Sequence, residues 1–104
     1  MIAVLVQFKL PASMTREHVK ELFADIAFMF FDIPGLIRKY FLLAEDTDTV
    51  GGVYLWRSRQ DAERYYTENF RLSIREQFGS EPFIIYFESP VVVDNMTGEA
   101  IAIS

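Results

Sequence analysis

The feature that most constrains this chain is a set of four strand-like segments that are apolar at consecutive positions. Strands of an antiparallel sheet with one face in water alternate apolar and polar side chains, because successive side chains point to opposite faces. Here both faces of each strand carry apolar groups, so both faces of the sheet must be covered. The segments are residues 2–9 (IAVLVQFK), 36–44 (LIRKYFLLA), 50–57 (VGGVYLWR) and 83–88 (FIIYFE).

Two segments with helical periodicity separate these strands. Thr15 is a suitable N-cap for a first helix, in which apolar residues recur at helical spacing until the Pro-Gly pair at residues 34–35. Ser58 is a suitable N-cap for a second helix, which continues with a bend near Asn69 until Gly79. The order β-α-β-β-α-β is the split βαβ arrangement of an α+β, ferredoxin-like fold. We expect a four-stranded antiparallel sheet with two helices on one face.

Two helices can cover only one face of such a sheet. A chain of 104 residues fits one domain and has no further helix for the second face. A second copy packed sheet to sheet is the simplest cover, and a two-fold dimer is its commonest form. We therefore expect a single domain over residues 1–104 that forms a homodimer, with residues 91–104 as a C-terminal hairpin or as an arm onto the partner.

Charge and cysteine usage exclude several functional classes. The net charge is −5, and the whole excess lies in residues 76–104, which contain five acidic and no basic side chains. An acidic protein without a basic stripe binds nucleic acid and anionic membranes poorly. The chain has no cysteine and one histidine, which disfavours disulfides, iron–sulfur clusters and zinc sites. We expect a cytoplasmic protein with no metal or other cofactor and with neither nucleic acid nor a membrane as partner.

Polar residues and glycines within the apolar strands are the candidate site residues. Gln7 interrupts the first strand and Lys39 the second, while Gly52, Tyr54 and Trp56 share one face of the third. If these side chains line an enclosed face, they form an apolar pocket with a few convergent polar groups. That is the usual composition of a small-molecule site.

Lys39 is the candidate residue best suited to take part in a reaction. Alternation along its strand gives it three apolar face neighbours: Ile37, Phe41 and Leu43. A desolvated lysine has a lowered pKa and can act as an acid, a base or a hydrogen-bond donor. The alternative is that Lys39 pairs with an acid such as Glu88, and that Tyr54 and Trp56 only pack an interface. The sequence leaves both interpretations open.

Several of these residues belong to a pattern that resembles a known family. Residues 34–37 (Pro-Gly-Leu-Ile) with Lys39, residues 51–56 (Gly-Gly-Val-Tyr-Leu-Trp), and Ala62 and Tyr65 resemble the small monooxygenases of the dimeric α/β-barrel superfamily. The resemblance extends over roughly residues 2–90 and includes Gln7. It implies a ferredoxin-like fold, a homodimer with a central β-barrel, and a cavity between sheet and helices. It also implies cofactor-independent oxygenation of a small aromatic or polyketide-like substrate.

On this hypothesis, Lys39 and Tyr54 are catalytic residues that stabilise a substrate anion. Gln7, Gly52 and Trp56 then bind the substrate, with Trp56 stacked on its ring. Two other functions stay open. A non-redox cyclase or isomerase would use the same pocket for acid–base chemistry and would turn over without oxygen. A non-catalytic ligand-binding or stress-associated module would keep its affinity for the ligand when Lys39 is replaced by alanine.

Overall fold

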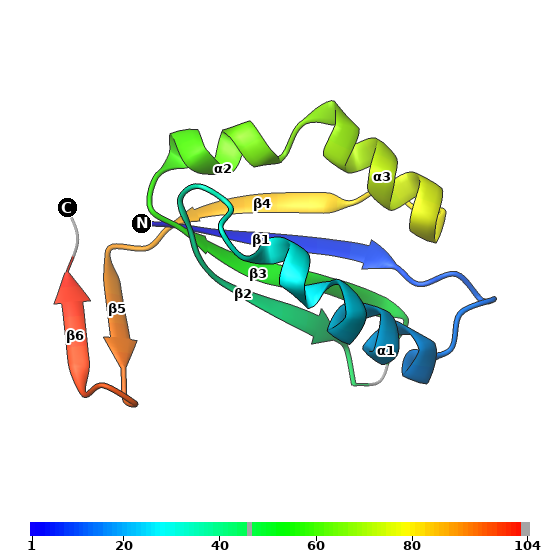
Figure 1. The fold of residues 1–104 in the computed structure, drawn as a ribbon, viewed down its shortest axis with the longest axis horizontal. Coiled ribbons are helices and arrows are strands. Elements are labelled where there is room, and N and C mark those ends of the chain that lie inside the picture. The colour runs from blue at the N-terminus through cyan, green and yellow to red at the C-terminus, as the bar shows by residue number, and fades with distance from the viewer. Residues whose placement is uncertain (46, 103–104) are drawn as a thin grey trace.

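The computed structural model describes residues 1–45 and 47–102, and their elements follow the predicted order (Figure 1). The predicted α+β, ferredoxin-like fold is confirmed. The elements are β1 (Ile2–Lys9), α1 (Arg16–Ile26), the 3-10 helix η1 (Ala27–Phe30), β2 (Leu36–Leu43), β3 (Thr49–Trp56), α2 (Arg59–Tyr65), α3 (Glu68–Phe78), β4 (Phe83–Glu88), β5 (Val91–Asp94) and β6 (Glu99–Ala102).

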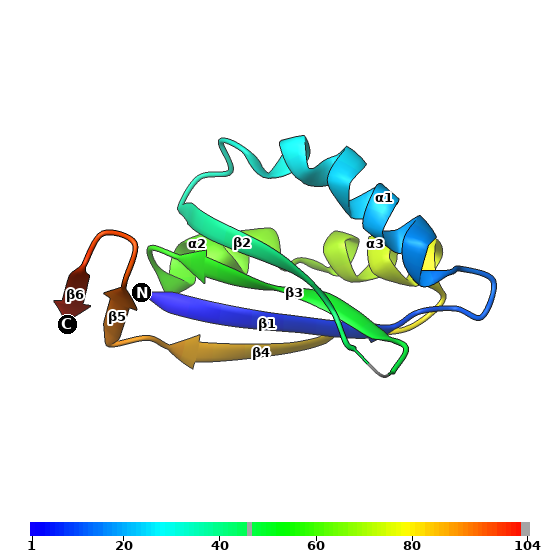
Figure 2. The same cartoon turned by 90° about the horizontal axis from the view of Figure 1, so that it is seen from below.

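Strands β1 to β4 form one antiparallel sheet in the order β2-β3-β1-β4. The helices lie on one face of this sheet (Figures 1 and 2), as their apolar stripes require. The core fills the space between the two layers. Its buried residues are Val4, Val6, Phe8, Val19, Phe23, Val50, Tyr54, Trp56, Ala62 and Phe78.

Side-chain caps define where the helices begin. The hydroxyls of Thr15 and Ser58 accept backbone hydrogen bonds in the first turns of α1 and α2, so both predicted caps are confirmed. The second predicted helix is instead two helices, because the chain leaves helical geometry at Tyr66 and Thr67 caps α3. The bend expected near Asn69 is therefore a complete break that occurs slightly earlier in the chain.

A register shift in β2 changes which residues share a face with Lys39. The pairing of β2 with β3 shifts between Leu36 and Arg38, which leaves Ile37 as an extra residue. Leu36 therefore packs on the core, while Ile37 is 39% exposed. The prediction that Ile37 shares the face of Lys39 is wrong for this reason. Phe41 lies beyond the shift and does share that face.

The second face of the sheet is apolar, and no helix of the described chain covers it. Four of its side chains are exposed: Tyr40, Leu42, Phe83 and Phe87. Four more are half-buried by their neighbours alone: Leu5, Val53, Leu55 and Ile85. A face of this kind needs a cover in water.

Strands β5 and β6 form a separate antiparallel hairpin, which stands apart from the main sheet (Figure 1). One oxygen of the Asp94 carboxylate lies 3.0 Å from the Arg38 guanidinium of β2. Its other oxygen accepts the backbone N–H groups of Met96 and Thr97, and the bond from Arg38 contributes most to lowering the pKa of Asp94. Contact of this hairpin with a partner stays a prediction, and residues 103–104 lie outside the described residues.

Candidate functional site

A cavity of about 200 Å³ lies between the sheet and the helices. Its floor comes from β1, β2 and β3, and its walls come from α1, η1, α3 and the end of α2. Most of its lining is aliphatic or aromatic. The lining side chains with a polar group are Lys39, Tyr54, Tyr65, Ser73 and Gln77.

Lys39 extends from β2 into a cluster of aromatic rings that we call the lysine cage. Its Nζ lies 3.5 Å from the ring centroid of Phe30, 3.9 Å from that of Phe41 and 4.6 Å from that of Tyr54. The ring faces favour the ammonium form, whereas burial favours the neutral amine. Burial dominates and lowers the pKa of Lys39 to about 7. Near neutral pH the amine can therefore both accept and donate a proton.

Within the part of the chain that the structure describes, Lys39 has no acidic partner. Among the described residues, no carboxylate forms an ion pair with its Nζ. Glu88, the partner considered from the sequence, is exposed at the end of β4 and lies opposite Ile2. The alternative in which these two residues pair is therefore wrong, and Lys39 stays available to a ligand in the cavity.

Tyr54 lines the cavity beside Lys39 and is only 4% exposed. Its burial, and then the neighbouring Tyr65, raise its pKa above the ordinary value for tyrosine. Tyr54 is thus a neutral phenol at physiological pH and can donate a hydrogen bond. Its ring is nearly parallel to that of Trp56, with an interplanar angle of 7° and centroids 6.2 Å apart, which fixes its orientation.

Trp56 has no exposed surface and is not part of the cavity lining. Its Nε1–H donates a 3.0 Å hydrogen bond to the Tyr66 hydroxyl, and the rings of Tyr65 and Tyr66 pack against it. Trp56 therefore supports Tyr54 from within the core. The structure does not bring it to the place where it could stack on a substrate.

Gln7 lies on the opposite side of the sheet from the cavity. Val6 and Phe8 of β1 are buried and line the cavity, and alternation then directs Gln7 to the open face, where it is exposed. The prediction that Gln7 joins Lys39 and Tyr54 in one pocket is wrong for this protomer, because both faces of β1 are apolar and residue type does not distinguish the cavity side from the open side.

Gly51 and Gly52 make room for the strands beneath the lysine cage. A Cβ on Gly52 would lie 2.8 Å from the carbonyl oxygen of Tyr40 and 3.3 Å from Cε of Lys39. A Cβ on Gly51, whose φ is +158°, would lie 1.8 Å from the carbonyl oxygen of Val6. Backbone atoms of the neighbouring strands therefore lie close to both glycines, and Gly52 also lines the cavity as predicted.

Two polar residues of the cavity were missed from the sequence. Ser73 and Gln77 of α3 line it together with Phe70, Ile74 and Phe78. These five positions follow the spacing i, i+3, i+4, i+7, i+8, which marks one helix face. The same spacing, counted from Phe70 in the sequence, could have identified Ser73 and Gln77 as residues on the apolar face of the helix. Leu72 lies outside this set of positions and is 41% exposed.

The fold and the cavity define a class of protein, namely a ferredoxin-like α+β domain with an apolar cavity between sheet and helices. The family described as "Putative mono-oxygenase ydhR" matches residues 4–83. The chain belongs to this monooxygenase family. No curated protein sequence is significantly similar to it.

Solved structures share the fold at low sequence identity. SnoaB from Streptomyces nogalater, a cofactor-independent oxygenase, has a TM-score of 0.61 and 17% identity over 85% of this chain and 91% of its own. A protein from Deinococcus radiodurans, described as "a putative antibiotic biosynthesis monooxygenase", has a TM-score of 0.66 and 14% identity over 100% of this chain and 99% of its own. ActVA-Orf6 of Streptomyces coelicolor, a monooxygenase solved in complex with Nanaomycin D, has a TM-score of 0.63 and 16% identity over 85% of this chain and 86% of its own. These identities support a shared fold alone.

Proposed function

We propose that this protein is a cofactor-independent monooxygenase that acts on a small aromatic or polyketide-like substrate in the sheet–helix cavity. The observation that carries the proposal is the Lys39 amine, which lines an apolar cavity and has no carboxylate partner among the described residues. Membership of a monooxygenase family supports the reaction class. SnoaB and ActVA-Orf6 support the choice of mechanism and of ligand, respectively.

The proposed reaction converts an activated CH₂ group, such as that of an anthrone, into a ketone. The neutral amine of Lys39 removes a proton, and the resulting ammonium stabilises the substrate anion together with the Tyr54 hydroxyl. The anion transfers electrons to O₂ and forms a C–O bond, the Lys39 ammonium returns the proton to give a hydroperoxide, and the hydroperoxide then loses water to leave the ketone. One oxygen atom enters the ketone and the other leaves as water. The substrate supplies all four electrons, so no external reductant is required.

Oxygen uptake by the purified protein with a panel of anthrones, which carry such a CH₂ group, tests this proposal. We expect uptake in step with formation of the oxidised product, and no turnover under nitrogen. Turnover that persists without oxygen would instead indicate the cyclase or isomerase. Ligand binding with no product would indicate the non-catalytic module, and no uptake across the panel would contradict the proposal.

We also propose that a second copy of the chain covers the open face of the sheet. That face carries exposed aromatic and aliphatic side chains on β2 and β4, including Tyr40, Leu42 and Phe83. Burying apolar area stabilises an association by about 25 cal/mol for each Å² removed from water. Two identical apolar faces related by a two-fold axis would cover each other.

A charge placed on this face is expected to separate the dimer. Phe83 is 63% exposed in the protomer, so Phe83→Glu should leave the protomer folded while placing a carboxylate in the interface. Light scattering coupled to size-exclusion chromatography should report a dimer for the native protein and a monomer for the variant. Leu72→Glu, on the outside of α3, serves as the control and should stay dimeric. A native protein that elutes as a monomer would contradict the proposal.

A further inference from the structure

The sheet–helix cavity has a mouth formed by two elements. Of the residues that line the cavity, only Met29, Ser73 and Gln77 are exposed. Met29 belongs to η1, and the other two belong to α3. The cavity therefore opens to solvent between η1 and α3, and we call these three residues the rim.

The size of the cavity determines what must pass the rim. An apolar cavity of about 150 Å³ can hold one benzene ring. The volume of about 200 Å³ found here thus accommodates one aromatic ring, with little room beyond it. A fused-ring substrate whose reacting ring lies in the lysine cage must extend through the mouth, where it meets Ser73 and Gln77.

The rim side chains are free to contact such a substrate. Neither the Ser73 hydroxyl nor the Gln77 amide hydrogen-bonds to another described residue, and the side-chain hydrogen bonds of α3 are made by Arg71 and Arg75 instead. The remaining positions on this helix face are apolar and pack on the core. Two polar side chains on an otherwise apolar face, at the edge of a ligand-sized cavity, are suited to selecting a ligand.

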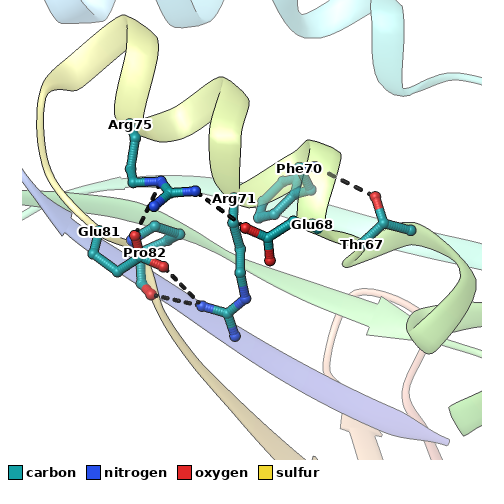
Figure 3. Close-up of polar contacts among 7 residues, drawn as sticks. All are labelled: Thr67, Glu68, Phe70, Arg71, Arg75, Glu81 and Pro82. Carbon is teal, nitrogen blue, oxygen red and sulfur yellow. Dashed lines mark hydrogen bonds and ion pairs between the residues drawn. The ribbon is translucent and has the colours of Figure 1, made fainter.

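Helix α3 holds these groups in place through its outer surface. Glu81, in the loop before β4, contacts the Arg71 guanidinium at 3.3 Å and that of Arg75 at 3.2 Å. Arg75 also contacts Glu68 at 3.1 Å, and Arg71 donates a hydrogen bond to the carbonyl of Pro82 (Figure 3). Helix α3, which carries Ser73 and Gln77, is thereby tied to the loop that precedes β4.

We propose that Ser73 and Gln77 form a binding subsite that hydrogen-bonds a hydroxyl or carbonyl on the far ring of the substrate. The inference rests on the proposed function and specifies its substrate class. The substrate is a flat, fused-ring molecule with an acidic group at Lys39 and a second polar group at the rim.

Equilibrium binding of two aromatic probes tests the subsite. The probes are a naphthol and a dihydroxynaphthalene whose second hydroxyl lies on the far ring, titrated by calorimetry without oxygen. The native protein should bind the second probe about 3- to 10-fold more tightly, which is the range of one net hydrogen bond. Ser73→Ala and Gln77→Met should each reduce this ratio, and the double variant should bring it to about one, with the affinity for naphthol retained. Glu76→Met, on the exposed side of the same helix, should keep the native ratio.

A ratio unchanged in the double variant, or a native protein that binds neither probe, would overturn the subsite. Because this experiment needs no turnover, it separates the two proposals. The expected affinities without any oxygen uptake would remove the monooxygenase assignment and keep the subsite. Oxygen uptake together with an affinity ratio that is unchanged in the double variant would keep the monooxygenase assignment and remove the subsite.

Discussion

Replacing Lys39 with methionine is expected to abolish oxygen uptake and, at the same time, to stabilise the folded protein near neutral pH. Methionine fills the same apolar space and packs well against aromatic rings, but it can neither accept a proton nor stabilise an anion. Loss of a general base lowers turnover by about 10²-fold or more. The same pKa predicts that kcat/KM of the native protein rises with pH through about 7, as the Lys39 amine becomes neutral.

The stabilisation follows from the lowered pKa of Lys39. Its pKa is about 7 in the folded chain, against about 10.4 for a lysine in an unfolded chain. Between these values the unfolded state binds more protons than the folded state. The stability of the native protein therefore rises with pH in this window, by at most about 1.4 kcal/mol per pH unit, and is lowest at and below pH 7. The methionine variant lacks this dependence.

Urea unfolding of both proteins at pH 7, 8 and 9 measures the effect. The advantage of Lys39→Met should be largest at pH 7 and should shrink toward pH 9. Higher pH is avoided because Tyr54 and Tyr66 have raised pKa values in the folded protein. They would ionise first in the unfolded chain, and this would lower the stability of the fold for a reason unrelated to Lys39. Lys20→Met, which removes an exposed lysine of α1, should change little. A stability difference that does not vary with pH would contradict a desolvated Lys39.

Replacing Gly51 with alanine is expected to prevent the sheet from forming properly. The added Cβ would lie 1.8 Å from the carbonyl oxygen of Val6 and 2.8 Å from its carbonyl carbon. Both atoms are backbone of β1, the strand that pairs with β3 at the centre of the sheet. Relief requires the two central strands to separate. We expect a loss of about 4 kcal/mol or more in the free energy of unfolding, which is the upper end for single substitutions.

Gly79→Ala provides the matched control for this prediction. Gly79 ends α3 with φ +74°, and a Cβ there would meet no atom within 4 Å. The substitution therefore adds only backbone strain, about 1–2 kcal/mol for a left-handed residue other than glycine. Circular dichroism and urea unfolding of the two variants should show a folded Gly79→Ala protein and a largely unfolded Gly51→Ala protein. Equal stabilities would show that β1 and β3 tolerate the side chain.

Local signals in the sequence predicted most of the fold. Residues 2–9 and 83–88 coincide with β1 and β4, because continuous β-branched and aromatic runs bounded by turn residues leave little choice of boundary. Thr15 and Ser58 were identified as caps because a hydroxyl before an amphipathic segment satisfies the first free N–H groups. Thr67 has the same chemistry, but it lies inside a continuous helical pattern, so its role as a third cap was missed.

The candidate site was predicted only where alternation along a strand was undisturbed. Lys39 and Tyr54 do share a face, because they pair directly across β2 and β3 in the regular part of the register. Ile37 was assigned to the wrong face because of a register shift in β2 that the sequence does not indicate. Gln7 was misplaced because both faces of β1 are apolar, so composition could not tell the cavity side from the open side. Whether Ser73 and Gln77 of α3 reach the cavity depends on how the helix is rotated over the sheet, which only the packed structure defines.

The lysine cage and the rim belong to parts of the molecule that tolerate change differently. Lys39 and Tyr54 face each other across paired strands of the sheet, where most substitutions disturb the core. Ser73 and Gln77 are exposed positions on a helix whose outer side is tied down by Arg71 and Arg75. On the proposed function, ligand preference can therefore diverge between homologues, or in a directed-evolution library, while Lys39 and the fold are retained. Codons 73 and 77 are the place to begin such a library.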